Sequence, residues 1–194
     1  MNSSRRQASI ALLAALVGLG LAGHSYAADV QVPFVLQASL MAKVAGFDRN
    51  FSARAGNKAI VLLVTAPGDT DSARAALAMK SALSELPKIG DLPHEEEIVS
   101  FTSATALADL VRSKRAAIVY FGPGFGKQVP AIRDAFSSVS VLTVGAVAEY
   151  VPDGMVLGFD LVSGHPKLLV KLEQARKQQV SFPASVLSLM KVYR

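Results

Sequence analysis

The stretch "AIVLLVTAPGDTDSARAALAMKSALSEL", residues 59–86, decides the class of fold. It begins with a continuous apolar run, Ala59 to Val64, which is rich in β-branched residues and bounded by turn signals. Such a run is typical of a strand covered on both faces. The loop APGDTD follows, and its Asp71 is the expected N-cap of a helix from Ser72 to about Leu86. A buried strand that leads into an amphipathic helix predicts one unit of an α/β fold.

The same alternation continues along the chain. Three further strand-like runs follow: EEEIVSF (95–101), AAIVYF (116–121) and VSVLTV (139–144). A helical pattern comes after each of the first two. Thr102 or Ser103 is the candidate cap of the first of these helices, and residues 128–137 form the second. Strands in such an alternation pair in parallel through right-handed crossovers. We therefore expect a three-layer α/β sandwich with a mostly parallel sheet and flanking helices.

The two ends of this pattern differ from its middle. Apolar residues at helical spacing between residues 35 and 47 predict a first helix, and ARAGNK (53–58) has the composition of a turn. After Gly145, the strand-like runs Met155–Val162 and Lys167–Lys171 are separated by only four residues, which predicts an antiparallel hairpin at the edge of the sheet. A short helix over 172–178 and a last helix that begins at Pro183 follow.

The N-terminus has the pattern of a secretory signal peptide. Arg5 and Arg6 precede an apolar run over 8–22 that is too short for a comfortable membrane span, and Ser25-Tyr26-Ala27 offers small residues at a cleavage site. We expect residues 1–27 to be removed and residues 28–194 to form a single α/β domain in the periplasm. The alternative is an N-terminal anchor helix that stays in place.

Composition excludes several classes of function. The 194 residues are 51% hydrophobic and 18% charged, as in a globular domain, and contain no cysteine. The absence of cysteine excludes a disulfide, a zinc–thiolate site, a Cys nucleophile and a lipoprotein anchor. Without Arg5 and Arg6, 18 basic residues face 15 acidic ones, a net charge of +3. That charge is too small for a nucleic-acid-binding surface. The basic residues from Lys167 onward are either a solvated helix face or a surface for an anionic partner.

One glycine-rich loop has the position of a ligand site. GPGFGK (122–127) follows a strand and opens a helix, as phosphate-binding loops do, although it matches neither G-x-x-x-x-G-K-[ST] nor G-x-G-x-x-G. In an open α/β sheet, ligands bind beyond the carboxyl ends of the strands. The candidate residues for a ligand or a partner are Thr65, Gly122, Gly124, Phe125, Gly126 and Gly145. The alternative is a plain tight turn.

No catalytic or metal-binding constellation stands out. Only His94 and His165 remain after the predicted cleavage, and neither has a second histidine at ligand spacing. There is no G-x-S-x-G motif, and each histidine lies beside a predicted turn. Asp160 is the one carboxylate inside an apolar strand, where it faces water at an edge or is buried and hydrogen-bonded. We therefore predict no catalytic residue, no metal and no cofactor, and we expect that the protein is not an enzyme.

Residues 142–189 carry a family resemblance. The pattern consists of an LTVG strand (142–145), a Gly154-Met155 start to a hairpin, a strand running into an Ala-Arg-containing helix (168–176), and a Ser-x-x-Leu-x-Leu last helix, for which this chain has Ser-x-Leu-x-Leu at 185–189. LMAKVAGFDRNF (40–51) matches the first helix of the same family. In these features the sequence resembles the YfiR/HmsC-like periplasmic family.

The resemblance implies an α/β domain that represses an inner-membrane diguanylate cyclase by binding its periplasmic part, and so controls cyclic di-GMP and biofilm formation. The repressors of the family use cysteines in a redox-sensitive fold, and this chain has none, so a disulfide-gated switch is excluded here. Lys171 also replaces an expected Asn. The leading hypothesis is a regulatory protein that binds such a partner through the hairpin, the basic C-terminal helix or an apolar patch. The alternative is a periplasmic protein that binds a small ligand, and a homodimer is open in either case.

Overall fold

The computed structural model describes residues 32–194, so the predicted signal peptide lies outside the described residues. The helices are α1 (Phe34–Gly46), α2 (Phe51–Ala55), α3 (Thr70–Ser84), α4 (Ala104–Lys114), α5 (Val129–Ala135), α6 (Tyr150–Asp153), α7 (Leu172–Lys177) and α8 (Ala184–Leu187). The strands are β1 (Ala59–Thr65), β2 (His94–Ser100), β3 (Ile118–Phe121), β4 (Leu142–Gly145), β5 (Leu157–Val162), β6 (His165–Lys171) and β7 (Lys191–Tyr193).

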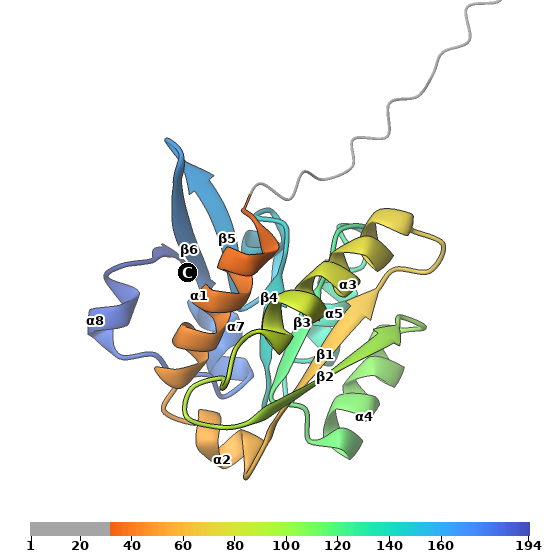
Figure 1. Cartoon of the computed structure of the whole chain (residues 1–194), viewed down its shortest axis with the longest axis horizontal. Coiled ribbons are helices and arrows are strands. Elements are labelled where there is room, and N and C mark those ends of the chain that lie inside the picture. The colour runs from red at the N-terminus through yellow and green to blue at the C-terminus, as the bar shows by residue number, and fades with distance from the viewer. Residues whose placement is uncertain (1–31) are drawn as a thin grey trace, which may run out of the picture.

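All seven strands form one sheet in the order β2-β1-β3-β4-β5-β6-β7. The first five strands of that order are parallel, β5 pairs with β6 in antiparallel fashion, and β7 runs parallel to β6. Helices α1 and α3 pack together on one face, while α4 and α5 pack together on the other (Figure 1). The predicted three-layer sandwich with a mostly parallel sheet and a C-terminal hairpin is confirmed.

The structure corrects four local predictions. The hairpin is not the edge of the sheet, because β7 pairs with the outer side of β6. The last helix, α8, ends at Leu187, and the strand β7 follows where a longer helix was expected. The N-cap of α3 is Asp69 and not Asp71, because the Asp69 carboxylate accepts hydrogen bonds from the N–H groups of Asp71 and Ser72, each at 2.9 Å. The predicted turn at 53–58 begins inside the short helix α2.

The hydrophobic core is centred on β1 and β3, two strands formed by continuous apolar runs of the sequence. Every residue of β3 is buried, and β1 is buried except at Ile60, as expected for strands with helices on both faces. Two polar side chains cross this core with their hydrogen bonds satisfied: the Tyr120 hydroxyl donates to the Gln37 side-chain oxygen over 2.9 Å, and the Gln37 amide donates to the Val32 carbonyl over 2.8 Å. These bonds attach α1 to the middle of the sheet.

A buried ion pair joins the two ends of the domain. The Asp48 carboxylate lies 2.7 Å from the Arg54 guanidinium, and both side chains are at most 3% exposed. Asp48 also accepts a hydrogen bond of 2.8 Å from the Ser181 N–H, and Arg54 donates to the Gln179 carbonyl over 3.0 Å. Asn50 donates to the same carbonyl over 2.7 Å. We call this group the Asp48–Arg54 latch, because it fixes the α1–α2 segment to residues 179–181.

Replacement of Arg54 tests the latch. Arg54→Met leaves the Asp48 carboxylate buried without its cation, and we expect the free energy of unfolding to fall by about 3–5 kcal/mol. Chemical denaturation measures this change. Arg74→Met is the matched control, since its pair with Asp71 is exposed at the surface, and it should change stability little. Equal, small effects of the two substitutions would show that the latch does not hold the domain together.

Buried tyrosines make the fold sensitive to alkali. Burial raises the pKa of Tyr120 well above its usual value of 10.0, and burial also raises that of Tyr150. Since the folded-state pKa lies above the unfolded one, the stabilisation is complete below pH 10 and is lost as the pH rises further. Tyr120→Phe should lower stability at neutral pH by about 1–3 kcal/mol, because Gln37 loses a partner, and should flatten its decline above pH 10. Denaturation series from pH 7 to 11.5 give both values, and parallel curves for the two proteins would refute the assignment.

Candidate functional site

The structure brings the predicted binding residues to one edge of the sheet. Thr65 ends β1, Gly145 ends β4, and the loop with Gly122, Gly124, Phe125 and Gly126 follows β3 between them. In the sheet register, Val64 lies opposite Phe121, and Phe121 lies opposite Gly145. The six predicted residues therefore lie together at the carboxyl ends of the parallel strands, as expected.

Side chains of the protein itself fill this edge. Phe125 is fully buried, and its ring packs edge-on against Phe101 and Phe121 at centroid distances of 5.4 and 5.3 Å. The N–H of Phe125 donates to the Tyr150 hydroxyl over 2.9 Å. A Cβ atom added to Gly145 would lie 3.0 Å from the Tyr150 Cβ.

The other predicted residues also make internal contacts. The Thr65 hydroxyl donates to the Val99 carbonyl over 3.3 Å. Gly122 lies against Ser72, so that a Cβ atom there would be 3.3 Å from the serine hydroxyl. Gly124 has φ +90, and a Cβ atom on it would collide with the Asp69 carboxylate that caps α3. Gly126 is the roomiest of the set, with the Tyr150 ring 4.0 Å from the position of a Cβ atom. A binding role for these residues stays a prediction.

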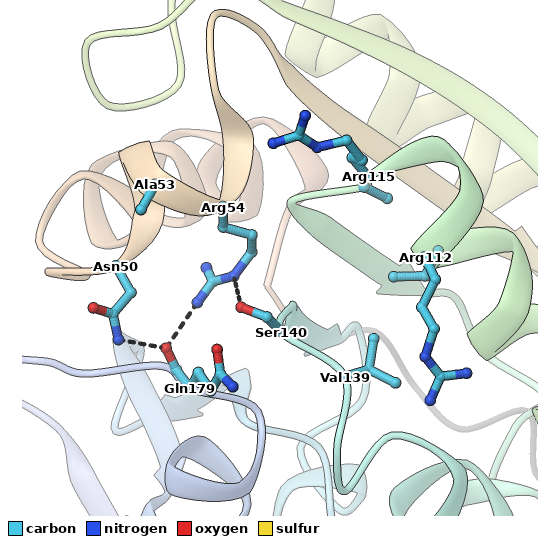
Figure 2. A pocket seen from close by; sticks show the side chains of 10 residues that line it. Asn50, Ala53, Arg54, Arg112, Arg115, Val139, Ser140 and Gln179 are labelled. Carbon is cyan, nitrogen blue, oxygen red and sulfur yellow. Dashed lines mark hydrogen bonds between the residues drawn. The ribbon is translucent and has the colours of Figure 1, made fainter.

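A pocket of about 530 Å³ lies at the opposite end of the parallel strands, beside the amino ends of β3 and β4 (Figure 2). Helix α2, the end of α4, the segments before β3 and β4, and the turn after α7 supply its lining. Those residues are Asn50, Ala53, Arg54, Val111, Arg112, Arg115, Ala116, Val139, Ser140 and Gln179. The sequence analysis did not identify this pocket, because its walls come from segments that are distant in the sequence.

We call this hollow the arginine pocket, because arginines are the only charged residues in its lining. It contains three arginines and no acidic side chain. Arg54 is committed to internal contacts: besides Asp48 and Gln179, it donates to the Ser140 hydroxyl over 3.3 Å (Figure 2). Arg112 pairs with Asp109 at 2.9 Å, but both side chains are about half exposed or more. Among the described residues, Arg115 forms no salt bridge.

A second hollow of about 440 Å³ adjoins the first at Arg115, and Lys58 and Lys114 also line it. These lysines pair with Glu95 and Glu97 of the edge strand β2, and both pairs are partly exposed. Arg115 is thus the cation shared by two neighbouring hollows, and it is the one without an internal acidic partner in the described part of the chain.

The two histidines of the described residues lie on strands that are far apart in the sheet, His94 on β2 and His165 on β6. His94 is held between the Glu96 carboxylate and the Leu86 carbonyl, and its side chain is 7% exposed. His165 begins β6 at the exposed tip of the hairpin, opposite Val162. Within residues 32–194, no three His, Cys, Asp or Glu side chains come close enough to hold a metal ion. Asp160 lies in the outer half of β5 and is partly exposed.

No helix in the described part of the chain combines the length and the apolar character that crossing a membrane requires.

Solved structures share the fold at low sequence identity. The chain aligns with a conserved domain protein from Vibrio cholerae O1 biovar El Tor at a TM-score of 0.57 and 14% identity, covering 84% of this chain and 60% of that one. It aligns with the ABC domain from Streptococcus pneumonia in complex with L-Trp at a TM-score of 0.54 and 12% identity, covering 80% and 62%. For the ligand-free, open structure of CD0873, a substrate binding protein with adhesive properties from Clostridium difficile, the TM-score is 0.52, the identity 9%, and the coverage 75% and 57%.

This chain therefore spans about three fifths of the length of each of these proteins. The likeness to them establishes a shared α/β fold. No curated protein matches the sequence. A family described as YfiR/HmsC-like matches residues 35–191, nearly the whole of the described structure. The match includes nearly all of α1, the strands β1 to β6, the first residue of β7 and the lining of the arginine pocket. The chain belongs to the YfiR/HmsC-like family.

Proposed function

We propose that the protein binds the periplasmic part of an inner-membrane signalling protein, a diguanylate cyclase, and thereby modulates cyclic di-GMP signalling. The observation that carries this proposal is the family match over residues 35–191. The signal-peptide pattern at residues 1–27 supports a location in the periplasm, where such a partner is accessible.

The hairpin is the surface best suited to such a contact. Strand β5 pairs with β4 only at Leu157 and Gly158, and β6 pairs with β7 only from Leu169 onward. The outer half of the hairpin consequently extends beyond both neighbouring strands (Figure 1). Leu161 and Val162 are 37% and 51% exposed there. Because successive residues of a strand point to opposite faces, the protruding hairpin offers a partner one exposed apolar side chain on each face.

The contact is not controlled by a disulfide, because the chain contains no cysteine.

A double substitution on the hairpin tests both the function and the surface. We expect the protein comprising residues 28–194 to capture the periplasmic part of a host cyclase, and Leu161→Asp/Val162→Asp to weaken capture at least tenfold by placing charges in an apolar contact. Pull-down and titration with the purified periplasmic fragment measure the effect. Leu77→Asp, on an exposed residue of α3, is the matched control and should bind normally.

The outcomes separate the two ideas. Normal capture by the hairpin variant would move the contact to another surface. Absence of capture by the unaltered protein, together with unchanged cyclic di-GMP after deletion of the gene, would refute the function itself.

A second candidate function is the binding of a small ligand, and the arginine pocket favours it. Two proteins of similar fold support this candidate by their descriptions, one as a domain in complex with L-Trp and the other as a substrate binding protein. The predicted residues at the carboxyl edge, from Thr65 to Gly145, are the other location for such a ligand.

A further inference from the structure

The arginine pocket combines open space with one cation, Arg115, that has no acidic partner among the described residues. Val111, Ala116 and Val139 form its floor and are at most 3% exposed, while Asn50 and Ser140 add polar groups to the lining. A space of about 530 Å³ is of the size that proteins use for small molecules. Since no carboxylate lines it, an anionic group that enters the pocket meets no like charge in its walls.

Arg115 is the cation most available to such an anion. Arg54 already donates to a carboxylate, a hydroxyl and a carbonyl, so its hydrogen-bonding capacity is largely used inside the protein. Arg112 shares an exposed pair with Asp109 at the surface. The guanidinium of Arg115 forms no salt bridge within the described residues, and guanidinium groups bind carboxylate and phosphate through two parallel hydrogen bonds.

The backbone at Arg115 is a second, independent feature. Arg115 ends α4 in the left-handed conformation, with φ 54 and ψ 42, at a position where helices most often carry glycine. Only three non-glycine residues of the described chain have positive φ, and two of them, Arg115 and Gln179, line this pocket. Strained residues of this kind cluster at ligand-binding sites.

The left-handed backbone of Gln179 is held by hydrogen bonds from side chains, and that of Arg115 is not within the described structure. The carbonyl of Gln179 accepts hydrogen bonds from Asn50 and Arg54, so the latch explains its conformation. The side chain of Arg115 is exposed and makes no such contact within the described structure. A glycine would serve the helix end better than this arginine, so its presence there calls for a role of its side chain.

We propose that the arginine pocket binds a small anionic molecule, with its carboxylate or phosphate group held by Arg115 and assisted by Arg112. This proposal rests on the second candidate function, the binding of a small ligand, and it assigns that function a site and a ligand chemistry.

Arg115→Gly is the decisive variant, because stability and binding should change in opposite directions. Glycine relieves the left-handed strain, and we expect Tm to rise by about 2–4 °C. The same change removes the guanidinium, and the affinity should fall at least tenfold. Isothermal titration with inorganic phosphate and, separately, with succinate measures binding, and the two titrations distinguish a phosphate site from a carboxylate site.

Two further variants separate charge from strain. Ser163→Gly relieves a left-handed residue in the hairpin turn, φ 52, far from the pocket lining, so Tm should rise similarly while the affinity stays unchanged. Arg115→Lys keeps both the strain and the charge, and should retain most of the affinity with an unaltered Tm. Arg112→Gln should weaken binding less than Arg115→Gly does. Higher salt should weaken binding throughout, because the contact is exposed and ionic.

The proposal fails if the unaltered protein binds neither phosphate nor succinate at millimolar concentration, or if Arg115→Gly binds them as well as the unaltered protein does. A thermal-shift screen with neutral and cationic small molecules distinguishes this failure from that of the second candidate function. A stabilising hit that Arg115→Gly leaves unaffected would support ligand binding by the protein while overturning this site.

Discussion

The buried pair of Asp48 and Arg54 is the interaction on which the arrangement of this domain depends. Two charges removed from water are stabilising only when their remaining hydrogen-bonding groups are satisfied. Here the Asp48 carboxylate accepts from Arg54, Asn50 and Ser181, and Arg54 donates in addition to Ser140 and Gln179. These partners come from the start, the middle and the end of the domain. The ion pair thus holds the first helices, the segment before β4 and the C-terminal turn at fixed positions around one pocket.

The arginine pocket is a consequence of this arrangement. One wall of the pocket is the Asp48–Arg54 latch, in which the charge of Arg54 is neutralised by Asp48. The end of α4, with Arg112 and Arg115, forms another wall. The carboxyl edge of the sheet, by contrast, is closed by Phe125 and Tyr150. The usual position of ligands in open α/β sheets is therefore packed with side chains here, and open space is found at the amino ends of β3 and β4.

The sequence predicted most of the fold because the decisive signals are local. The apolar runs that became β1 and β3, the helix after β1, and the short connection between β5 and β6 each lie within a few residues of sequence. The N-cap of α3 was assigned to Asp71 rather than Asp69 because both aspartates occupy the same loop, and only the geometry shows which carboxylate faces the free N–H groups. Strand β7 was missed because three residues carry no measurable periodicity, and their pairing with β6 depends on tertiary contacts.

The candidate site was less accessible to sequence reasoning. A glycine-rich loop after a strand has a recognisable pattern, whereas the arginine pocket has none, since Asn50, Arg115 and Gln179 are far apart along the chain. One signal was present in the sequence: "RSKRAA" (112–117) ends a helix without glycine or asparagine, so an arginine must adopt the left-handed conformation there. Such a mismatch between a residue and its backbone position becomes recognisable once the end of the helix is known.

The latch also determines the order in which the domain can be completed. Asp48 meets a partner 133 residues later in the chain, and Arg54 meets one 125 residues later. Contacts of such long sequence separation form late and slowly, because the intervening chain must first be ordered. During synthesis, Asp48 and Arg54 can pair with each other, but the Ser181 N–H and the Gln179 carbonyl are missing until nearly the last residues have emerged. The segment from α1 to α2 therefore gains its full set of polar contacts only after the turn at residues 179–181 has been made.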